Sequence, residues 1–183
     1  MFGWNYAMLT LRQKLGKEVI MASKSDFAPI EWARIVQAPL LAGFAVSCAD
    51  PSSFLGSIQE SFAAAKLVVD GKNTLNNPLI QAACQELATS NGRADAREGL
   101  RTISQAAKID DMKKRSLEAL KDVAHILAHK APQDADAFKD WLKDIATKVA
   151  EAGTDGGFLG FGGIKVSDLE KATLDEISTI LAE

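Results

Sequence analysis

Hydrophobic residues recur every three or four positions along nearly the whole chain, and no segment alternates convincingly with a period of two. This pattern predicts helices and no sheet. The first stripe comprises Phe2, Trp4, Met8, Leu11, Leu15 and Val19, with Arg12, Lys14 and Lys17 on or beside the other side. We expect it to pack on its own domain, with peripheral contact to a membrane surface as the less favoured alternative. Met21 opens MASKSD, which looks like an alternative start, so residues 1–20 are treated as an amphipathic N-terminal helix or extension.

The remaining stripes predict further helices. One runs from about Pro29 to Ala49 and is apolar on nearly all sides after Gln37, as is typical of a helix surrounded by others. Others are expected near 52–70, after the cap Asn77-Pro78, over 94–107 following an Asn91-Gly92 turn, over 110–130, and after Asp134. A Ser-x-x-Glu capping box from Ser167 to Glu170 opens the last helix, whose apolar positions begin at Leu169.

Composition narrows the class of protein. The chain has 183 residues, 47% of them hydrophobic and 25% charged, with a net charge of −3. We predict an all-α fold in which residues 21–183 form a single compact bundle, of about seven or eight helices in the chain, with a glycine-rich loop before the last helix. The acidic balance gives no general attraction to nucleic acid.

Three features of the sequence indicate where in the cell the protein is found. The longest uncharged run, 35–49, is shorter than the roughly 20 residues that span a bilayer. No secretory signal is visible. Cys48 and Cys84 are interpreted as buried free thiols in a reducing cytosol, with a disulfide as the alternative. We therefore expect a cytoplasmic protein without a transmembrane segment.

A glycine-rich loop is the most distinctive stretch. GTDGGFLGFGG, residues 153–163, holds six of the chain's thirteen glycines together with Phe158, Leu159 and Phe161. It matches neither a phosphate-binding loop nor a calcium loop. Its apolar side chains, carried on a backbone made pliable by glycines such as Gly160 and Gly162, are expected either to plug a groove in the protein's own helices or to bind a ligand or partner.

Both histidines of the chain lie in one helical stretch. His125 and His129 are one turn apart, and Asp122 and Glu118 continue the same stripe, so the four residues are candidate metal ligands. The stripe lies opposite the apolar face of Leu117, Leu120, Ala124 and Leu127 and should face solvent. HExxH is absent, and a solvated polar face is the simpler interpretation.

Other candidate chemistry is weaker. The basic residues Arg93, Arg97 and Arg101 share a helical face, but acidic residues interleave and no aromatic residue is present for stacking. We interpret this face as solvated and expect no nucleic-acid partner. No GxSxG or comparable nucleophile arrangement occurs, and the sequence requires no cofactor.

The C-terminal run GGFLGFGGIKVSDLEKATLDEISTIL resembles the ending of a group of bacterial all-helical proteins without an established activity, and this resemblance extends back to about Phe27. More distantly, Val166, Ser167 and Glu170 resemble the Val-Ser-x-x-Glu turn of tellurite-resistance TerB-like proteins. That resemblance implies metal-related stress and cation sites at Asp50 and Asp155. Asp50 is followed here by proline rather than glycine, and the second turn is much longer.

These observations favour a bacterial, non-enzymatic interaction or stress-associated module that forms a homodimer or binds a protein partner. The alternative is a TerB-like protein that binds a small ligand or metal, or an enzyme, with its site near residues 153–163 or on the stripe of His125 and His129.

Overall fold

The computed structural model describes residues 21–49, 77–152 and 166–183. Within these ranges the chain forms one 3-10 turn and six α-helices, and none of the described residues lies in a strand. The elements are η1 (Lys24–Asp26), α2 (Pro29–Ser47), α4 (Pro78–Ala88), α5 (Ser90–Ser104), α6 (Ile109–Lys130), α7 (Ala135–Ala152) and α8 (Asp168–Ala182). The all-α prediction is confirmed for this part of the chain. The expected total of seven or eight includes helices in 1–20 and 52–70, which lie outside the described residues.

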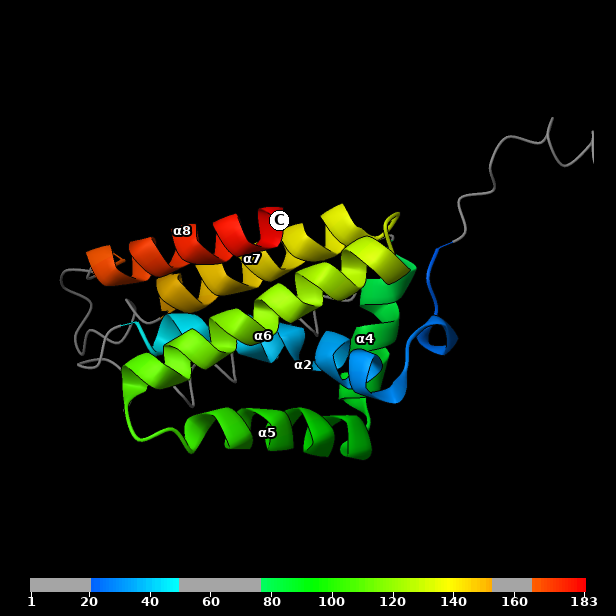
Figure 1. Cartoon of the computed structure of the whole chain (residues 1–183), viewed down its shortest axis with the longest axis horizontal. Helices are drawn as coiled ribbons and strands as arrows, with labels where there is room; N and C mark the ends of the chain where they lie inside the picture. Colours follow the sequence, from blue (N-terminus) through cyan, green and yellow to red (C-terminus); the bar gives the residue numbers. More distant parts are fainter. Residues whose placement is uncertain (1–20, 50–76, 153–165) are drawn as a thin grey trace, which may run out of the picture.

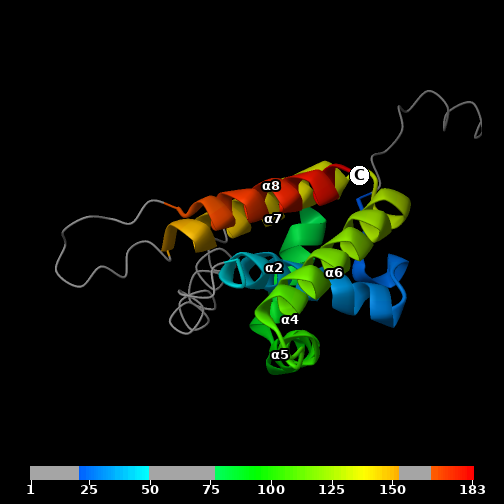
Figure 2. The same ribbon diagram turned by 60° about the vertical axis from the view of Figure 1, so that its left-hand side comes forward.

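Helix α2 is the centre of the fold. It packs against each of the other five described α-helices, and α7 and α8 lie side by side along it (Figures 1 and 2). From Ile35 to Ala49 every residue except Leu40 is buried. This agrees with the prediction of a surrounded helix, because a helix covered on all sides needs apolar residues around its whole circumference.

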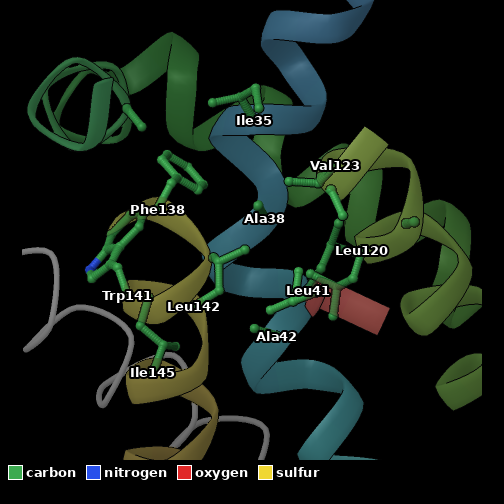
Figure 3. Close-up of a cluster of buried hydrophobic side chains, with 14 of the residues drawn as sticks. Ile35, Ala38, Leu41, Ala42, Leu120, Val123, Phe138, Trp141, Leu142 and Ile145 are labelled. Carbon is green, nitrogen blue, oxygen red and sulfur yellow. The ribbon is translucent and has the colours of Figure 1, made fainter. Parts of the chain in front are cut away.

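The core is formed where α6 and α7 meet α2. Figure 3 shows side chains of α2, including Leu41, between Leu120 of α6 and Leu142 of α7. Phe138 and Trp141 meet edge to face, with ring centroids 5.1 Å apart. The predicted inward face of residues 117–127 and the apolar stripe of α7 are both buried. The helical period therefore identified the core faces of α6 and α7 correctly.

Two predicted helix starts are confirmed in atomic detail. The Asn77 side chain accepts a hydrogen bond from Ile80 N at 3.0 Å, and Pro78 is the first residue of α4. Ser167 Oγ accepts from Glu170 N at 3.2 Å, while Glu170 Oε2 accepts from Ser167 N at 2.8 Å. Both caps satisfy backbone donors that the first helical turn leaves unpaired.

Two details of the sequence interpretation are wrong. Asn91 and Gly92 are not a turn but lie in the first turn of α5, because Thr89 Oγ1 accepts a hydrogen bond from Gly92 N at 2.9 Å and so starts the helix earlier. Leu169, expected on the apolar face of α8, is 56% exposed. The buried face of α8 instead includes Thr173, whose hydroxyl donates to the Leu169 carbonyl at 2.9 Å and so enters the core with its donor satisfied.

Candidate functional site: a surface groove between two helices

A groove of about 300 Å³ lies on the surface between the first turns of α2 and the C-terminal half of α6. It is open to solvent rather than enclosed. Its walls are Ile30, Glu31 and Arg34 from α2, and Asp122, His125 and Ile126 from α6. Spacings of three and four residues place each set on one face of its helix. Two helices that lie far apart in the sequence thus turn a mixed apolar and charged face toward the same groove.

The apolar part of the groove has one isoleucine from each helix. Ile30 is 70% exposed, whereas Ile126 is half-buried and packs against the core. Within the described ranges, Ile30 and Leu169 are the two exposed large hydrophobic residues. Covering an isoleucine side chain stabilises a complex by about 1.5–3 kcal/mol before the costs of association. Ile30 is therefore the strongest apolar contact that this groove offers.

The charged part of the groove is only partly paired. Glu31 Oε2 accepts a hydrogen bond from Ala28 N at 2.7 Å and lies 3.7 Å from Lys130 Nζ. Arg34, half-buried, and Asp122, exposed, form no ion pair with any described residue. A guanidinium presents five donors that match a carboxylate in two parallel hydrogen bonds. Arg34 and Asp122 thus leave one positive and one negative group available to an incoming molecule.

The rings of the two histidines are close together on α6, and His125 lines the groove. Their ring centroids are 4.1 Å apart, with 42° between the ring planes. His129 Nδ1 lies 2.8 Å from the carbonyl oxygen of His125, an arrangement in which Nδ1 carries the proton and donates it. The Nε2 lone pair of His129 is then the acceptor or metal-binding position of that ring. Only His125 of the pair lines the groove.

The predicted stripe of Glu118, Asp122, His125 and His129 is exposed, as the sequence indicated. Across residues 21–49, 77–152 and 166–183, however, no group of three or more histidine, cysteine, aspartate or glutamate side chains is arranged to hold a metal ion. The imidazoles of His125 and His129 are therefore close together, but the carboxylates of Glu118 and Asp122 do not complete a metal-binding group with them. Metal binding at this stripe stays a prediction from the sequence.

The other predicted site residues lie outside the described part of the chain. They are Asp50, Asp155, Phe158, Leu159, Gly160, Phe161 and Gly162. The choice between a plug and an interface at the 153–163 loop consequently stays a prediction, as do the two aspartates as cation sites.

A second cluster joins η1, α2 and α4. Lys24 Nζ donates to Glu86 Oε2 at 2.5 Å, Trp32 Nε1 donates to the same oxygen at 3.2 Å, and Lys24 Nζ lies 5.8 Å from the Trp32 ring centroid. The hydrogen bond from Lys24 is the main cause of a lowered pKa at Glu86, against the opposing effect of desolvation. Phe27 completes the packing on Trp32, with centroids 5.8 Å apart. The cluster secures the start of α2, which carries one wall of the groove.

Two of the three basic residues predicted to share a face of α5 have local structural partners. Arg93 Nη1 donates to the Ala88 carbonyl at 2.6 Å and thereby covers the C-terminal end of α4. Arg101 donates twice to Glu98, at 2.6 and 2.7 Å. Arg93, Arg97 and Arg101 are all exposed, which agrees with the interpretation of a solvated face.

The two thiols are free. Cys48 is buried, and this burial raises its pKa to about 12. Cys84 is half-buried, and burial raises its pKa as well. A thiol that stays protonated is a poor nucleophile and metal ligand. These cysteines behave as small hydrophobic residues of the core and its border.

Comparison with known proteins finds no match: no family model, no curated protein and no solved structure matches the chain. None of the helices in the described ranges has both the length and the apolar character needed to cross a membrane. The fold and the groove must therefore be interpreted from their own residues.

Sequence reasoning identified the α6 wall of the groove but missed the α2 wall. Asp122 and His125 were candidates because the histidine spacing drew attention to their stripe. Ile30 and Arg34 are also four residues apart, which would have suggested a shared face. No sequence signal could place that face opposite Asp122, because the pairing depends on how α2 packs against α6.

Proposed function

We propose that this protein is a non-enzymatic helical interaction module whose partner protein binds in the groove between α2 and α6. The observation that carries the proposal is the position of Ile30, 70% exposed at the rim of a groove that also contains Arg34, which forms no ion pair with any described residue. Arginine is enriched among the residues that contribute most of the binding energy of protein interfaces, and covering Ile30 would add the burial of an apolar side chain. An open groove between two helices suits an amphipathic helix better than an enclosed small molecule.

The contacts around the groove support a preformed binding surface. Glu31 is held in place at one end of the groove, because its carboxylate accepts a hydrogen bond from Ala28 N and forms an ion pair with Lys130. From Ile35 onward most residues of α2 are buried, so packing in the core fixes the position of this helix. A surface held by packed helices binds with less loss of conformational entropy than a surface on a loop. Arg34 would pair with a carboxylate of the partner, and Asp122 with a cation.

The sequence resemblances extend the proposal in two directions. The resemblance to TerB-like proteins supports a role in a stress response. The loop of Phe158, Leu159 and Phe161 would form a second binding surface if it does not pack on the helices. Both rest on the sequence alone, whereas the groove rests on described side chains.

The test is a binding experiment with matched variants. The protein is used to isolate partners from cells of its source, and chemical cross-links map the contact surface on each side. Ile30→Ser and Arg34→Glu should each weaken capture at least about tenfold, since each removes about 1.4 kcal/mol or more of interface energy. Leu169→Ser is the control, because it removes the other exposed large hydrophobic residue of the described ranges, which lies on α8 and does not line the groove.

The result has two clear alternatives. Cross-links at α2 and α6 together with loss of capture in the groove variants alone would support the proposal. Cross-links elsewhere, with full capture by Ile30→Ser and Arg34→Glu, would contradict it. Thermal melts of all three variants should match the parent protein within a few degrees, because none of the three positions is buried and surface substitutions rarely change stability by more than about 0.5 kcal/mol.

A second candidate function is binding of a metal or small ligand at the histidine pair. It is favoured by one observation: His129 Nδ1 is engaged by the His125 carbonyl, which leaves Nε2 available beside a second imidazole. Native mass spectrometry of protein purified without added metal, then titrated with zinc, tests it. Binding that is lost in His125→Ala and in His129→Ala would support this function, and zinc binding equal in parent and variants would contradict it.

A further inference from the structure

Asp134 is a buried carboxylate with few partners. It directly precedes α7 and is 0% exposed. Its Oδ2 accepts a hydrogen bond from Ala22 N at 2.8 Å, whereas its Oδ1 is buried and has no hydrogen-bond partner among the described residues. None of the ion pairs within the described ranges includes Asp134. Burying a carboxylate is costly unless an opposite charge and further hydrogen bonds replace the lost water, so Asp134 needs a cation that the described side chains do not supply.

The residue that contacts Asp134 follows a methionine. Met21 opens MASKSD, so Ala22 would be the second residue of a chain that starts at Met21. Ala22 is itself buried and belongs to the hydrophobic core. The next residue is held in place too, because Ser23 N and Ser23 Oγ both donate to Asp26 Oδ2 at 2.8 Å. Packing and these hydrogen bonds therefore fix the position of Ala22 N against Asp134.

An α-ammonium group at Ala22 would satisfy this carboxylate better than a peptide N–H does. A peptide nitrogen has one hydrogen to donate and no charge, whereas an ammonium group has three hydrogens and a positive charge. Oδ1 and Oδ2 belong to the same carboxylate, so a second hydrogen of the same nitrogen can be directed at Oδ1. Hydrogen bonds that involve charged groups are also about twice as strong as neutral ones. A change at one atom thus supplies both the missing charge and the missing donor.

We infer that the functional chain begins at Ala22 and that its α-ammonium group forms a buried ion pair with Asp134. Translation starts at Met21, and an aminopeptidase hydrolyses the Met21–Ala22 peptide bond in the nascent chain. Water supplies the hydroxyl that completes the methionine carboxylate, and the Ala22 nitrogen becomes an amine that is mostly protonated at pH 7. Aminopeptidases that remove an initial methionine need a small second side chain, which alanine provides. The inference makes no use of the groove and is independent of the proposed function.

The N-terminus of the protein isolated from cells of its source tests the assigned start. Labelling of free α-amines followed by mass spectrometry should identify Ala22 as the first residue, with its amine unmodified. Met21→Leu in the gene, which removes the start codon, should abolish this species, whereas Met1→Leu should leave it unchanged. A chain that begins at Met1 or Met21, or an acetylated Ala22, whose nitrogen has no charge, would overturn the inference. Loss of the species in Met1→Leu but not in Met21→Leu would also overturn it, by showing cleavage of a longer chain.

The reactivity of the Ala22 amine tests the ion pair. In the folded protein an acylating reagent should modify this amine at least about tenfold more slowly than in urea, because a buried, protonated amine is a poor nucleophile. Asp134→Asn in the same chain should remove most of this protection. Asp136→Asn is the matched control, because it makes the same chemical change at an exposed residue of the first turn of α7. Equal rates in folded and unfolded protein, or protection that Asp134→Asn leaves unchanged, would overturn the inference.

A third measurement keeps the test decisive if Asp134→Asn does not fold. The protein with a free Ala22 amine is compared with the same protein made in cells that also express an α-amino acetyltransferase. Acetylation leaves one N–H and no charge on the nitrogen, as a peptide bond does. Urea unfolding should therefore show an unfolding equilibrium constant at least about tenfold larger for the acetylated form, because the partner of a buried carboxylate is lost. Equal stability of the two forms would overturn the ion pair.

Discussion

The side-chain amide of Gln37 on α2 occupies the space in which a β-carbon at Gly99 of α5 would lie. Such an atom would be 2.4 Å from Gln37 Cδ. Gln37 is only 9% exposed, and its Nε2 donates to the Asp95 carbonyl at 3.3 Å. The buried Gln37 amide therefore depends on Gly99. Because Gly99 has no side chain, the amide fits against α5 and can donate its hydrogen bond to the Asp95 carbonyl.

We expect the two positions to be coupled in stability. With Gln37 replaced by alanine, Gly99→Ala should stabilise the fold by up to about 1 kcal/mol, because alanine is the better helix former. With Gln37 present, the same change forces the amide from its place, and the gain should vanish or reverse. Urea unfolding of the four chains in a double-mutant cycle should give a coupling energy of about 1–2 kcal/mol. Additive effects would contradict the packing described.

Gly92 should tolerate no side chain. A β-carbon there would lie 2.1 Å from the backbone oxygen of Glu86, which cannot move aside as a flexible side chain can. We expect Gly92→Ala to lower the free energy of unfolding by about 1–3 kcal/mol despite the better helix propensity of alanine. Asn91→Ala, at the exposed neighbouring position of the same helical turn, is the control and should change stability by less than about 0.5 kcal/mol.

Glu86 should contribute stability that depends on pH. Its pKa is lowered chiefly by the hydrogen bond from Lys24, so the ionised form is favoured in the folded state. The contribution is full above the unfolded pKa of about 4.3 and is lost as pH falls through the lower folded pKa. Glu86→Gln should therefore destabilise the protein at pH 7 by up to about 1 kcal/mol, with a difference from the parent that shrinks below about pH 4.

Urea unfolding followed at several pH values measures this difference. Glu118→Gln is the matched control, because Glu118 is exposed on α6 and has no ion pair among the described residues. A Glu86→Gln effect that is constant from pH 7 to pH 3 would mean that the contact with Lys24 does not depend on the charge of Glu86.

The native fold should protect Cys48 from alkylation. Because burial raises its pKa to about 12, less than about one thiol in a thousand is ionised at pH 8, and the sulfur is covered by the core. Mass spectrometry after treatment with iodoacetamide should show Cys84 modified before Cys48, and both modified quickly in urea. Equal and rapid modification in the folded protein would contradict the buried position of Cys48.

The capping box of α8 should be a measurable source of stability. Ser167→Ala removes the acceptor for Glu170 N and should lower the free energy of unfolding by about 1 kcal/mol. Asp168→Ala changes an exposed residue of the same turn and should have a smaller effect. Thermal melts of both variants make the comparison, and equal shifts in Tm would show that the cap is not the source.

Much of the fold could be predicted because its determinants are local. The cap formed by Asn77 and Pro78 and the box of Ser167 and Glu170 act within one helical turn, so their residues are adjacent in the sequence. The apolar period likewise identified the buried faces of α6 and α7. The exposed stripe of His125 followed from the same geometry, since a face opposite the core must meet solvent.

What the sequence determined by itself was therefore the helical class, several helix starts, and which face of a helix is apolar. Only the tertiary structure decided which faces meet. It placed Ile30 and Arg34 opposite Asp122, left Leu169 exposed, and buried Gln37 against Gly99. The physical reason is range: capping and helical period act over about four residues, whereas the groove depends on the packing of helices that lie far apart along the chain.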